Sequence, residues 1–318
     1  MAVAQVTLGS SSVTTTPLGL GANAVGGVNL FPNLKDETGI EIVQAALDNG
    51  IQLLDTAFVY GLGHSEELIG KATAAYKRDT FQIADKAAQD LSSGEMVVSN
   101  RPDFLKRSVD EALTRLNTDY IDVFYIHFPD ADTPKAEAVG ALHDLKVAGK
   151  IRAVGVSNFS LAQIEEANQD GYVDVVENQF SLLHQDARAD VMPYLAEHNI
   201  SFVPFFPLAS GLLTGKYTAD TDLNFGEGDI RSGMDDFKQP RYSQILTAVD
   251  SLAPLAAAHK VSIAQLVLAY YIANPQVSVV IPGAKRPSQV EANAQALQVS
   301  LSEEEYAAIE KAFSAFAA

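Results

Sequence analysis

The stretch RPDFLKRSVDEALTRLNTDYIDVFYIHF, residues 101–128, carries the pattern that decides the fold. Its first part, 101–116, is a helical pattern of apolar and charged residues, and its last part, 121–128, is apolar almost throughout. A strand that is apolar on both faces is typical of a parallel sheet covered by helices on both sides. We therefore predict a helix followed by a buried parallel strand.

The same alternation of strand and helix recurs along most of the chain. One of the helical patterns, DETGIEIVQAALDNG, is expected to start on a capping Asp36 and to stop at Gly50. Eight strand-and-helix units in a row predict a (β/α)8 barrel. The eight strand cores begin at Leu18, Ile51, Phe81, Ile121, Ile151, Val173, Ile200 and Val277.

Three further segments complete the expected architecture. Residues 3–19 alternate about a Gly-Ser turn and predict an N-terminal β-hairpin. The polar, Gly-rich stretch 208–240 predicts a long, mobile loop after strand seven, and a helix ends the chain. Since no linker or break in composition divides the sequence, we expect a single barrel domain over residues 1–318.

The composition excludes several classes of function. The 318 residues carry a formal net charge of −18, which argues against nucleic acid or an anionic membrane as a partner. The absence of cysteine excludes a disulfide framework and thiol catalysis, and no histidine pair has a metal-site spacing. No long apolar run or leader-like N-terminus is present, so we expect a soluble cytoplasmic protein, with a monomer favoured.

Five motifs follow one another along nearly the whole chain: LDTAFVYGLGHSEELIG (54–70), YIHFPD (125–130), GKIRAVGVSNFS (149–160), FFPLASGLLTGKY (205–217) and VIPGAKRPSQVEANAQ (280–295). In this order they resemble those of the aldo-keto reductases. The subgroup that they resemble most is that of the bacterial NADPH-dependent reductases of the general-stress and inositol-operon type. The resemblance implies an oxidoreductase that reduces aldehydes or ketones to alcohols, or catalyses the reverse, with a small carbonyl compound as its partner.

The resemblance implies a catalytic tetrad of Asp55, Tyr60, Lys86 and His127, all at the C-terminal strand ends where barrel active sites gather. Hydride transfer to a carbonyl builds negative charge on its oxygen, so a proton donor must lie beside it. Tyr60 can donate that proton, and a nearby Lys86 ammonium is expected to lower the tyrosine pKa from roughly 10. Asp55 would hold Lys86, and His127 would donate a hydrogen bond to the substrate oxygen.

The resemblance also implies a cofactor site for NADP(H). Lys285 and Arg286 are adjacent cations in an acidic chain and would suit a 2′-phosphate, which favours NADP over NAD. Motif positions carry over to both ends of the cofactor. These residues are Ser157, Asn158, Glu177, Phe205, Leu208, Ser210, Gly211, Lys216, Gly283, Lys285, Arg286, Gln289 and Asn293.

Three positions depart from the family pattern: Asp85 stands for a usual Thr, Glu177 for Gln, and Phe205 for Tyr or Trp. Strand alternation places Lys86 and Glu177 inside the barrel and Asp85 towards the helices. A Glu177 carboxylate can accept from a carboxamide but cannot donate to it, and it would favour the positively charged NADP⁺ over NADPH. The alternative is that Gln179, which shares its parity, serves instead.

Two other functions stay open at this stage. A barrel that binds NADP(H) as a redox sensor with little turnover would explain the departures near the nicotinamide motifs. A Schiff-base lyase could use Lys86 as nucleophile, although a charged pair with Asp55 argues against it. Phe58 and Phe128 follow rim strands and could either line an apolar substrate pocket or serve only in packing.

Overall fold

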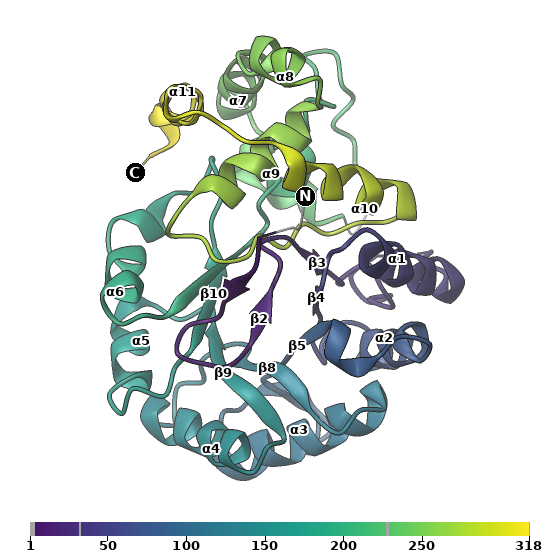
Figure 1. Ribbon diagram of the computed structural model, residues 1–318, viewed down its shortest axis with the longest axis vertical. Coiled ribbons are helices and arrows are strands. Elements are labelled where there is room, and N and C mark those ends of the chain that lie inside the picture. The colour runs from purple at the N-terminus through teal and green to yellow at the C-terminus, as the bar shows by residue number, and fades with distance from the viewer. Residues whose placement is uncertain (1–3, 32, 227–228, 318) are drawn as a thin grey trace.

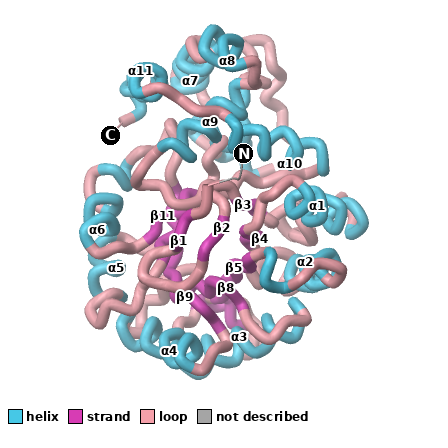
Figure 2. The backbone as a smooth tube through the Cα atoms, in the orientation of Figure 1, coloured by secondary structure: helices cyan, strands magenta, loops and turns pink. Residues whose placement is uncertain are grey.

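The computed structural model describes residues 4–31, 33–226 and 229–317. Within them, parallel strands form the inner ring of the molecule and helices form the outer ring (Figures 1 and 2). The sheet runs in the order β11-β10-β9-β8-β5-β4-β3, so that strands consecutive around the barrel follow one another in the chain. Its seven strands are β3 (Gly19–Gly21), β4 (Leu53–Asp55), β5 (Gln82–Ala87), β8 (Ile121–Ile126), β9 (Ile151–Ser157), β10 (Val175–Gln179) and β11 (Ser201–Phe205).

The eighth predicted strand, around Val280, closes the ring without forming a regular ladder. Val280 and Gly283 make isolated parallel bridges to Leu18 and Gly21. The Val280 N–H donates to the carbonyl of Pro17, and the Gly21 N–H donates to the carbonyl of Pro282. Because proline has no N–H, Pro17 and Pro282 can only accept in this seam, which limits the ladder. The predicted (β/α)8 barrel is confirmed, with this seam in place of a full eighth strand.

The helices follow the strands in the predicted order. The prediction that Asp36 caps the first helix is wrong: the cap is Lys35, and the Asp36 carboxylate instead lies 2.8 Å from Nε2 of His64. The predicted stop is confirmed, since Gly50 follows the helix with a φ of +79°. The helices are α1 (Asp36–Asp48), α2 (His64–Thr73), α3 (Pro102–Leu116), α4 (Lys135–Val147), α5 (Leu161–Ala167), α6 (Val191–Glu197), α7 (Arg241–Asp250), α8 (Ala253–His259), α9 (Ile263–Ala273), α10 (Pro287–Ala294) and α11 (Glu303–Ala312).

The predicted N-terminal hairpin pairs β1 (Val6–Thr7) with β2 (Thr14–Thr15) and covers the N-terminal end of the barrel (Figure 1). At its turn, the Gly9 N–H donates to Oγ of Ser201, at the start of β11. Two hairpin side chains, Leu8 and Val13, join the apolar cluster that fills the barrel interior. Since this end is closed by apolar packing, polar groups inside the barrel are reached from the C-terminal strand ends.

The predicted long loop after strand seven is more structured than its composition indicates. It contains the 3-10 turns η3 (Ala209–Thr214), η4 (Ile230–Gly233) and η5 (Asp235–Phe237), while residues 227–228 lie outside the described part. The predicted C-terminal helix is present as α11. Within the described ranges, no single helix is long and apolar enough to cross a membrane; Arg241–His259 and Ile263–Ala273 meet those criteria only together, across an 86° bend.

Candidate active site

Lys86 lies on β5 with its side chain fully buried inside the barrel, as strand alternation predicts. Its Nζ lies 2.5 Å from Oδ1 of Asp55 on the neighbouring β4 and donates to the Thr56 carbonyl at 3.0 Å. The expected ion pair between Lys86 and Asp55 is therefore present. Burial alone would lower the pKa of Lys86, but the carboxylate of Asp55, and Glu177 whenever it is ionised, raise it above its ordinary value, so the ammonium stays charged.

Tyr60 and His127 flank this ion pair. Nζ of Lys86 lies 5.8 Å from the centroid of the Tyr60 ring, and the rings of Tyr60 and His127 meet edge to face with centroids 6.2 Å apart. Burial and the Lys86 charge hold the pKa of His127 well below its usual range, so the imidazole is neutral. A neutral imidazole carries a single N–H, with which it can donate one hydrogen bond.

The predicted lowering of the Tyr60 pKa is not what the structure supports. Burial raises the pKa of Tyr60, and the attraction of Lys86 offsets only part of that rise. The negative charge of Asp55 raises it further, as does Glu177 whenever its carboxyl is ionised. Tyr60 is therefore protonated near neutral pH, in the form that a proton donor needs.

Glu177 lies inside the barrel as predicted, and its side chain makes a contact that the sequence did not indicate. Its Oε2 lies 3.3 Å from Nζ of Lys86, and only 3% of the residue is exposed. The carboxyl also neighbours that of Asp55, and burial together with that charge raises the pKa of Glu177 well above its usual range. Asp55, Lys86 and Glu177 form a buried group that we call the inner trio. Gln179, the alternative to Glu177, is exposed at the end of β10.

Tyr125 is a further polar residue of this site that sequence analysis missed. It is fully buried and pairs with Lys86 in the β5–β8 register, and its ring centroid lies 5.5 Å from Nζ of Lys86. No described residue forms a hydrogen bond with its hydroxyl. The ring lies over Gly155, where a Cβ atom would come within 2.2 Å of it. The sequence could have indicated it, because Tyr125 and His127 are two residues apart on one strand and so face the same side.

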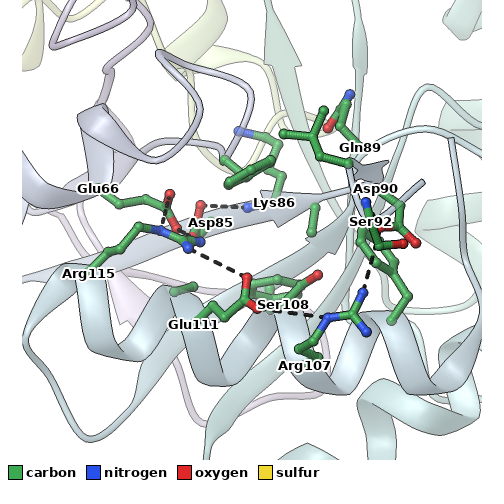
Figure 3. Close-up of a pocket in the computed structure, with 16 residues that line it drawn as sticks. Glu66, Asp85, Lys86, Gln89, Asp90, Ser92, Arg107, Ser108, Glu111 and Arg115 are labelled. Atoms are coloured by element: carbon green, nitrogen blue, oxygen red, sulfur yellow. Dashed lines mark hydrogen bonds and ion pairs between the residues drawn. The ribbon is translucent and has the colours of Figure 1, made fainter. Parts of the chain in front are cut away.

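Asp85 faces the helix layer, as predicted, away from the Lys86 side chain (Figure 3). Its Oδ1 accepts the backbone N–H of Lys86, and its carboxyl neighbours that of Glu66. Glu66 is fully buried and accepts two hydrogen bonds of 2.9 Å from Arg115 on α3. Glu66, Asp85 and Arg115 form the outer trio. It borders a cavity of about 220 Å³ between β5 and α3, which Phe58 also lines, so Phe58 serves this packing instead of the barrel mouth.

Ser157, Asn158, Glu177 and Phe205 come together at the ends of β9, β10 and β11, as the resemblance implies. Ser157 pairs with Glu177 across the sheet. Asn158 has a left-handed φ of +62° and donates from Nδ2 to the carbonyl of His127 at 3.0 Å. This bond joins the nicotinamide-motif strand to the strand of the tetrad histidine. Phe205 is partly buried and packs on the interior cluster.

Cations from two distant segments meet near the long loop. Burial and the charges of Arg231 and Lys216 lower the pKa of Lys285. Gly211 has a φ of +91°, and a Cβ there would lie 2.5 Å from Nζ of Lys216, so glycine leaves room for that ammonium. Arg231 is bound to Asp229, whereas Lys216 and Lys285 form no ion pair with any described residue. Two ammonium groups without an ion-pair partner in the described part of an acidic chain would suit the phosphates of a dinucleotide.

The remaining cofactor positions border this cation cluster. Leu208 precedes η3, and Ser210 lies within it with a left-handed φ of +54°. Gln289 accepts the backbone N–H of Lys285 at 2.8 Å, which fixes the start of α10. Gly283 and Arg286 are exposed before that helix, and Asn293 is buried near its end. The thirteen predicted cofactor residues thus lie on chain segments that run from the end of β9 to α10.

The mouth of the barrel is apolar and exposed. The large exposed apolar side chains of the described residues lie, with the exception of Val147, in segments that follow the C-terminal ends of strands. Phe128, which the sequence left open, is 36% exposed and stacks on His127 with ring centroids 4.5 Å apart. An exposed apolar patch beside buried polar groups is typical of a ligand site. The others are Val28, Leu30, Leu62, Leu91, Met96, Val97, Val98 and Phe206.

A barrel with this buried lysine–aspartate pair, tyrosine and histidine at its C-terminal end defines a class of oxidoreductase. Residues 17–313 match the model of the aldo/keto reductase family, and the chain belongs to that family. It is 34% identical over 287 residues to the aldo-keto reductase YhdN of Bacillus subtilis, which covers 90% of this chain and 86% of that protein. It is 29% identical to the NADH-specific methylglyoxal reductase of Escherichia coli, over 94% of this chain and 95% of that one.

Solved structures agree with this assignment. A glycerol dehydrogenase from Gluconobacter oxydans is similar with a TM-score of 0.89 and 31% identity, over 99% of this chain and 97% of that one. An aldo-keto reductase from Klebsiella pneumoniae, in complex with NADPH, is similar with a TM-score of 0.73 and 25% identity, over 98% and 96% of the two chains. The chain is therefore an oxidoreductase of the aldo/keto reductase type, as the resemblance implied.

Proposed function

We propose that this protein is an NADP(H)-dependent reductase of aldehydes or ketones, or catalyses the reverse oxidation of alcohols, with Tyr60 as the general acid or base. The carrying observation is the buried Lys86–Asp55 ion pair, beside which Tyr60 and the neutral His127 converge. The nicotinamide cofactor, when bound, supplies the hydride. Tyr60 donates the proton to the carbonyl oxygen, and His127 orients that oxygen by donating a hydrogen bond.

The protein's own groups also support the choice of cofactor. Within the described residues Lys216 and Lys285 have no ion-pair partner, and a 2′-phosphate would gain from such cations where NAD would not. Ser157 and Asn158 lie at the opposite end, beside His127, in position to hold the carboxamide. The relatives include both an NADPH-bound and an NADH-specific protein. The preference for NADPH over NADH therefore depends on this chain's own cations and has to be measured.

The substrate that fits the mouth is a carbonyl compound with an apolar body. Phe128 stacks directly on His127, so an aromatic or aliphatic group next to the carbonyl would lie against its ring. Residues 96–98 contribute further apolar surface after β5. We therefore expect aromatic aldehydes to be reduced with a higher kcat/KM than small hydrophilic ones.

The decisive experiment is the variant Tyr60→Phe, which removes only the donor hydroxyl. It is expected to abolish reduction of p-nitrobenzaldehyde, a loss of at least about 10²-fold in kcat. Binding of NADPH, measured by fluorescence titration, is expected to stay nearly intact and tighter than binding of NADH. Retained turnover in Tyr60→Phe would refute Tyr60 as the acid.

A second candidate function is an NADP(H)-binding redox sensor with little turnover. Glu177, which stands where the family usually has Gln, is the observation that supports this candidate. Stopped-flow mixing of the NADPH-loaded protein with the same aldehyde separates the two. Fast oxidation of the bound cofactor supports the reductase, whereas tight binding with no oxidation supports the sensor.

A further inference from the structure

Glu177 adds a second buried carboxyl beside Lys86, and the proposed reduction does not require it. The inner trio contains two buried carboxyls and one ammonium, each at most 3% exposed. Oδ1 of Asp55 lies 2.5 Å from Nζ of Lys86, and Oε2 of Glu177 lies 3.3 Å from the same nitrogen. With both carboxyls ionised, the trio would hold an unbalanced negative charge away from water. Two carboxyls that share one site cannot both ionise easily, so one of them keeps its proton.

The surroundings of Glu177 supply no other cation among the described residues. On β8, Tyr125 presents its ring and an unpartnered hydroxyl, and from β9 the register neighbour is Ser157. On β11 the register neighbour is the apolar Val203. Tyr60 faces the trio from the loop after β4 and is itself neutral. Among the described residues, Oδ2 of Asp55 has no hydrogen-bond donor and Oε2 of Glu177 has only its 3.3 Å contact with Nζ of Lys86, so a proton held between the two carboxyls would satisfy both oxygens.

We propose that Glu177 is held as a neutral carboxylic acid that shares its proton with Asp55, and that this proton replaces, through Lys86, the one that Tyr60 donates. The proposal deepens the proposed reductase function and rests on it for the second part. It makes Glu177 an internal proton source within the barrel. A neutral Glu177 also exerts no charge bias on the cofactor, which replaces the expectation that it favours NADP⁺.

The proton balance of the step is closed. The O–H bond of Tyr60 breaks as an O–H bond forms on the product alcohol. An N–H bond of Lys86 breaks as the Tyr60 O–H forms again, and the O–H of Glu177 breaks as the Lys86 N–H is restored. Glu177 ends as a carboxylate beside Lys86 and regains a proton from solvent after the product leaves.

The first test needs no turnover and uses the resting full-length protein. Infrared difference spectra of wild type against Glu177→Gln are expected to show a carboxylic-acid carbonyl band that the variant lacks. Asp174→Asn is the matched control, because Asp174 is also buried but has its own cation, Lys146, at 2.7 Å. It is expected to leave that band unchanged. A Glu177→Gln spectrum with no loss of the acid band would overturn the proposal, whether or not the protein reduces any aldehyde.

The second test follows one turnover of NADPH-loaded protein with p-nitrobenzaldehyde. In wild type, Glu177 is the group left without a proton after reduction, so its carboxylic-acid infrared band is lost transiently. Tyr60 is protonated again, so no tyrosinate absorbance accumulates. In Glu177→Gln, Tyr60 is the group left without a proton, so tyrosinate absorbance appears after cofactor oxidation. Equal tyrosinate signals in both proteins would overturn the relay. If no aldehyde is reduced at all, the proposed function and with it the relay fail, while the infrared result still decides the state of Glu177.

Discussion

Strand β5 separates two groups of buried ionisable residues. Each group has one Asp, one Glu and one basic residue, but the two groups have different surroundings. The inner trio, Asp55, Lys86 and Glu177, lies inside the barrel at the foot of the proposed active site. The outer trio, Glu66, Asp85 and Arg115, lies between the barrel and its helices, beside the cavity between β5 and α3 (Figure 3). Each has two carboxyls for one cation. What distinguishes them is that only the inner cation is within reach of Tyr60.

The difference shows how a barrel strand can carry catalytic and structural charges on successive residues. Asp85 and Lys86 are adjacent in sequence, yet their side chains leave the strand on opposite faces. The Arg115 guanidinium binds Glu66 through two parallel bonds and so ties α3 to α2. The ammonium of Lys86 bonds Asp55 and the Thr56 carbonyl instead of a helix, and it lies close enough to Tyr60 to affect its pKa. Replacing Lys86 and Arg115 one at a time tests whether the two trios have these different roles.

Removal of the inner cation is expected to have the largest effect on activity. Lys86→Met leaves two carboxyls facing Tyr60 without a positive charge, which disfavours loss of the tyrosine proton. We expect kcat for carbonyl reduction to fall by roughly 10²–10⁴-fold. Steady-state kinetics on folded protein, with circular dichroism as the control for folding, measure this. A loss of only a few fold would show that Lys86 is not part of the chemistry.

Removal of the outer cation is expected to affect stability instead. Arg115→Met leaves buried Glu66 without its partner, and breaking a buried pair in this way costs about 3 kcal/mol of unfolding free energy. Chemical denaturation measures this cost, and kcat of the remaining folded protein is expected to stay close to that of wild type. A large loss of kcat with unchanged stability would reverse the assignment of the two trios.

The pH dependence of stability gives a smaller effect of defined sign. Burial and the neighbouring Asp55 raise the pKa of Glu177, so the folded state keeps a proton that the unfolded chain releases above about pH 4.5. Stability from this group is complete below that pH and is lost as the pH rises through the raised folded pKa, by about 1.4 kcal/mol per pKa unit. Glu177→Gln is therefore expected to lose less stability than wild type between pH 5 and pH 9. Denaturation curves across this range check it; parallel curves would contradict it.

The smallest expected effect concerns the residue beside the lysine. Asp85→Thr restores the usual family residue and keeps an oxygen able to accept the Lys86 N–H, while removing one of the two outer carboxyls. We expect turnover to change by no more than a few fold, since Asp85 faces the helix layer. A larger loss in kcat, without a loss of folded protein, would show that the outer trio acts on Lys86 through the strand.

Much of the fold followed from local patterns, whereas the candidate site residues came from motifs and the family resemblance that they carry. The apolar strands, the helical segments between them and the order of the motifs predicted the barrel, and alternation alone placed Lys86 inward and Asp85 outward. The misses have physical causes. Asp36 has the chemistry of a helix cap but is the first helical residue of α1, and its carboxylate contacts His64 of α2. Tyr125 was missed because its closeness to Lys86 depends on the pairing of β5 with β8, which sets the two residues opposite each other.

By itself the sequence determined which side chains point into the barrel, because a strand's two-residue period fixes the face of every residue on it. Only the tertiary structure decided which charges meet. The distance from Glu177 to Lys86 depends on the stagger of strands that are far apart in the chain, and the desolvation that raises the Tyr60 and Glu177 pKa values depends on the closure of the whole ring. Electrostatic energies vary steeply with distance and burial, and both quantities exist only after the barrel has formed.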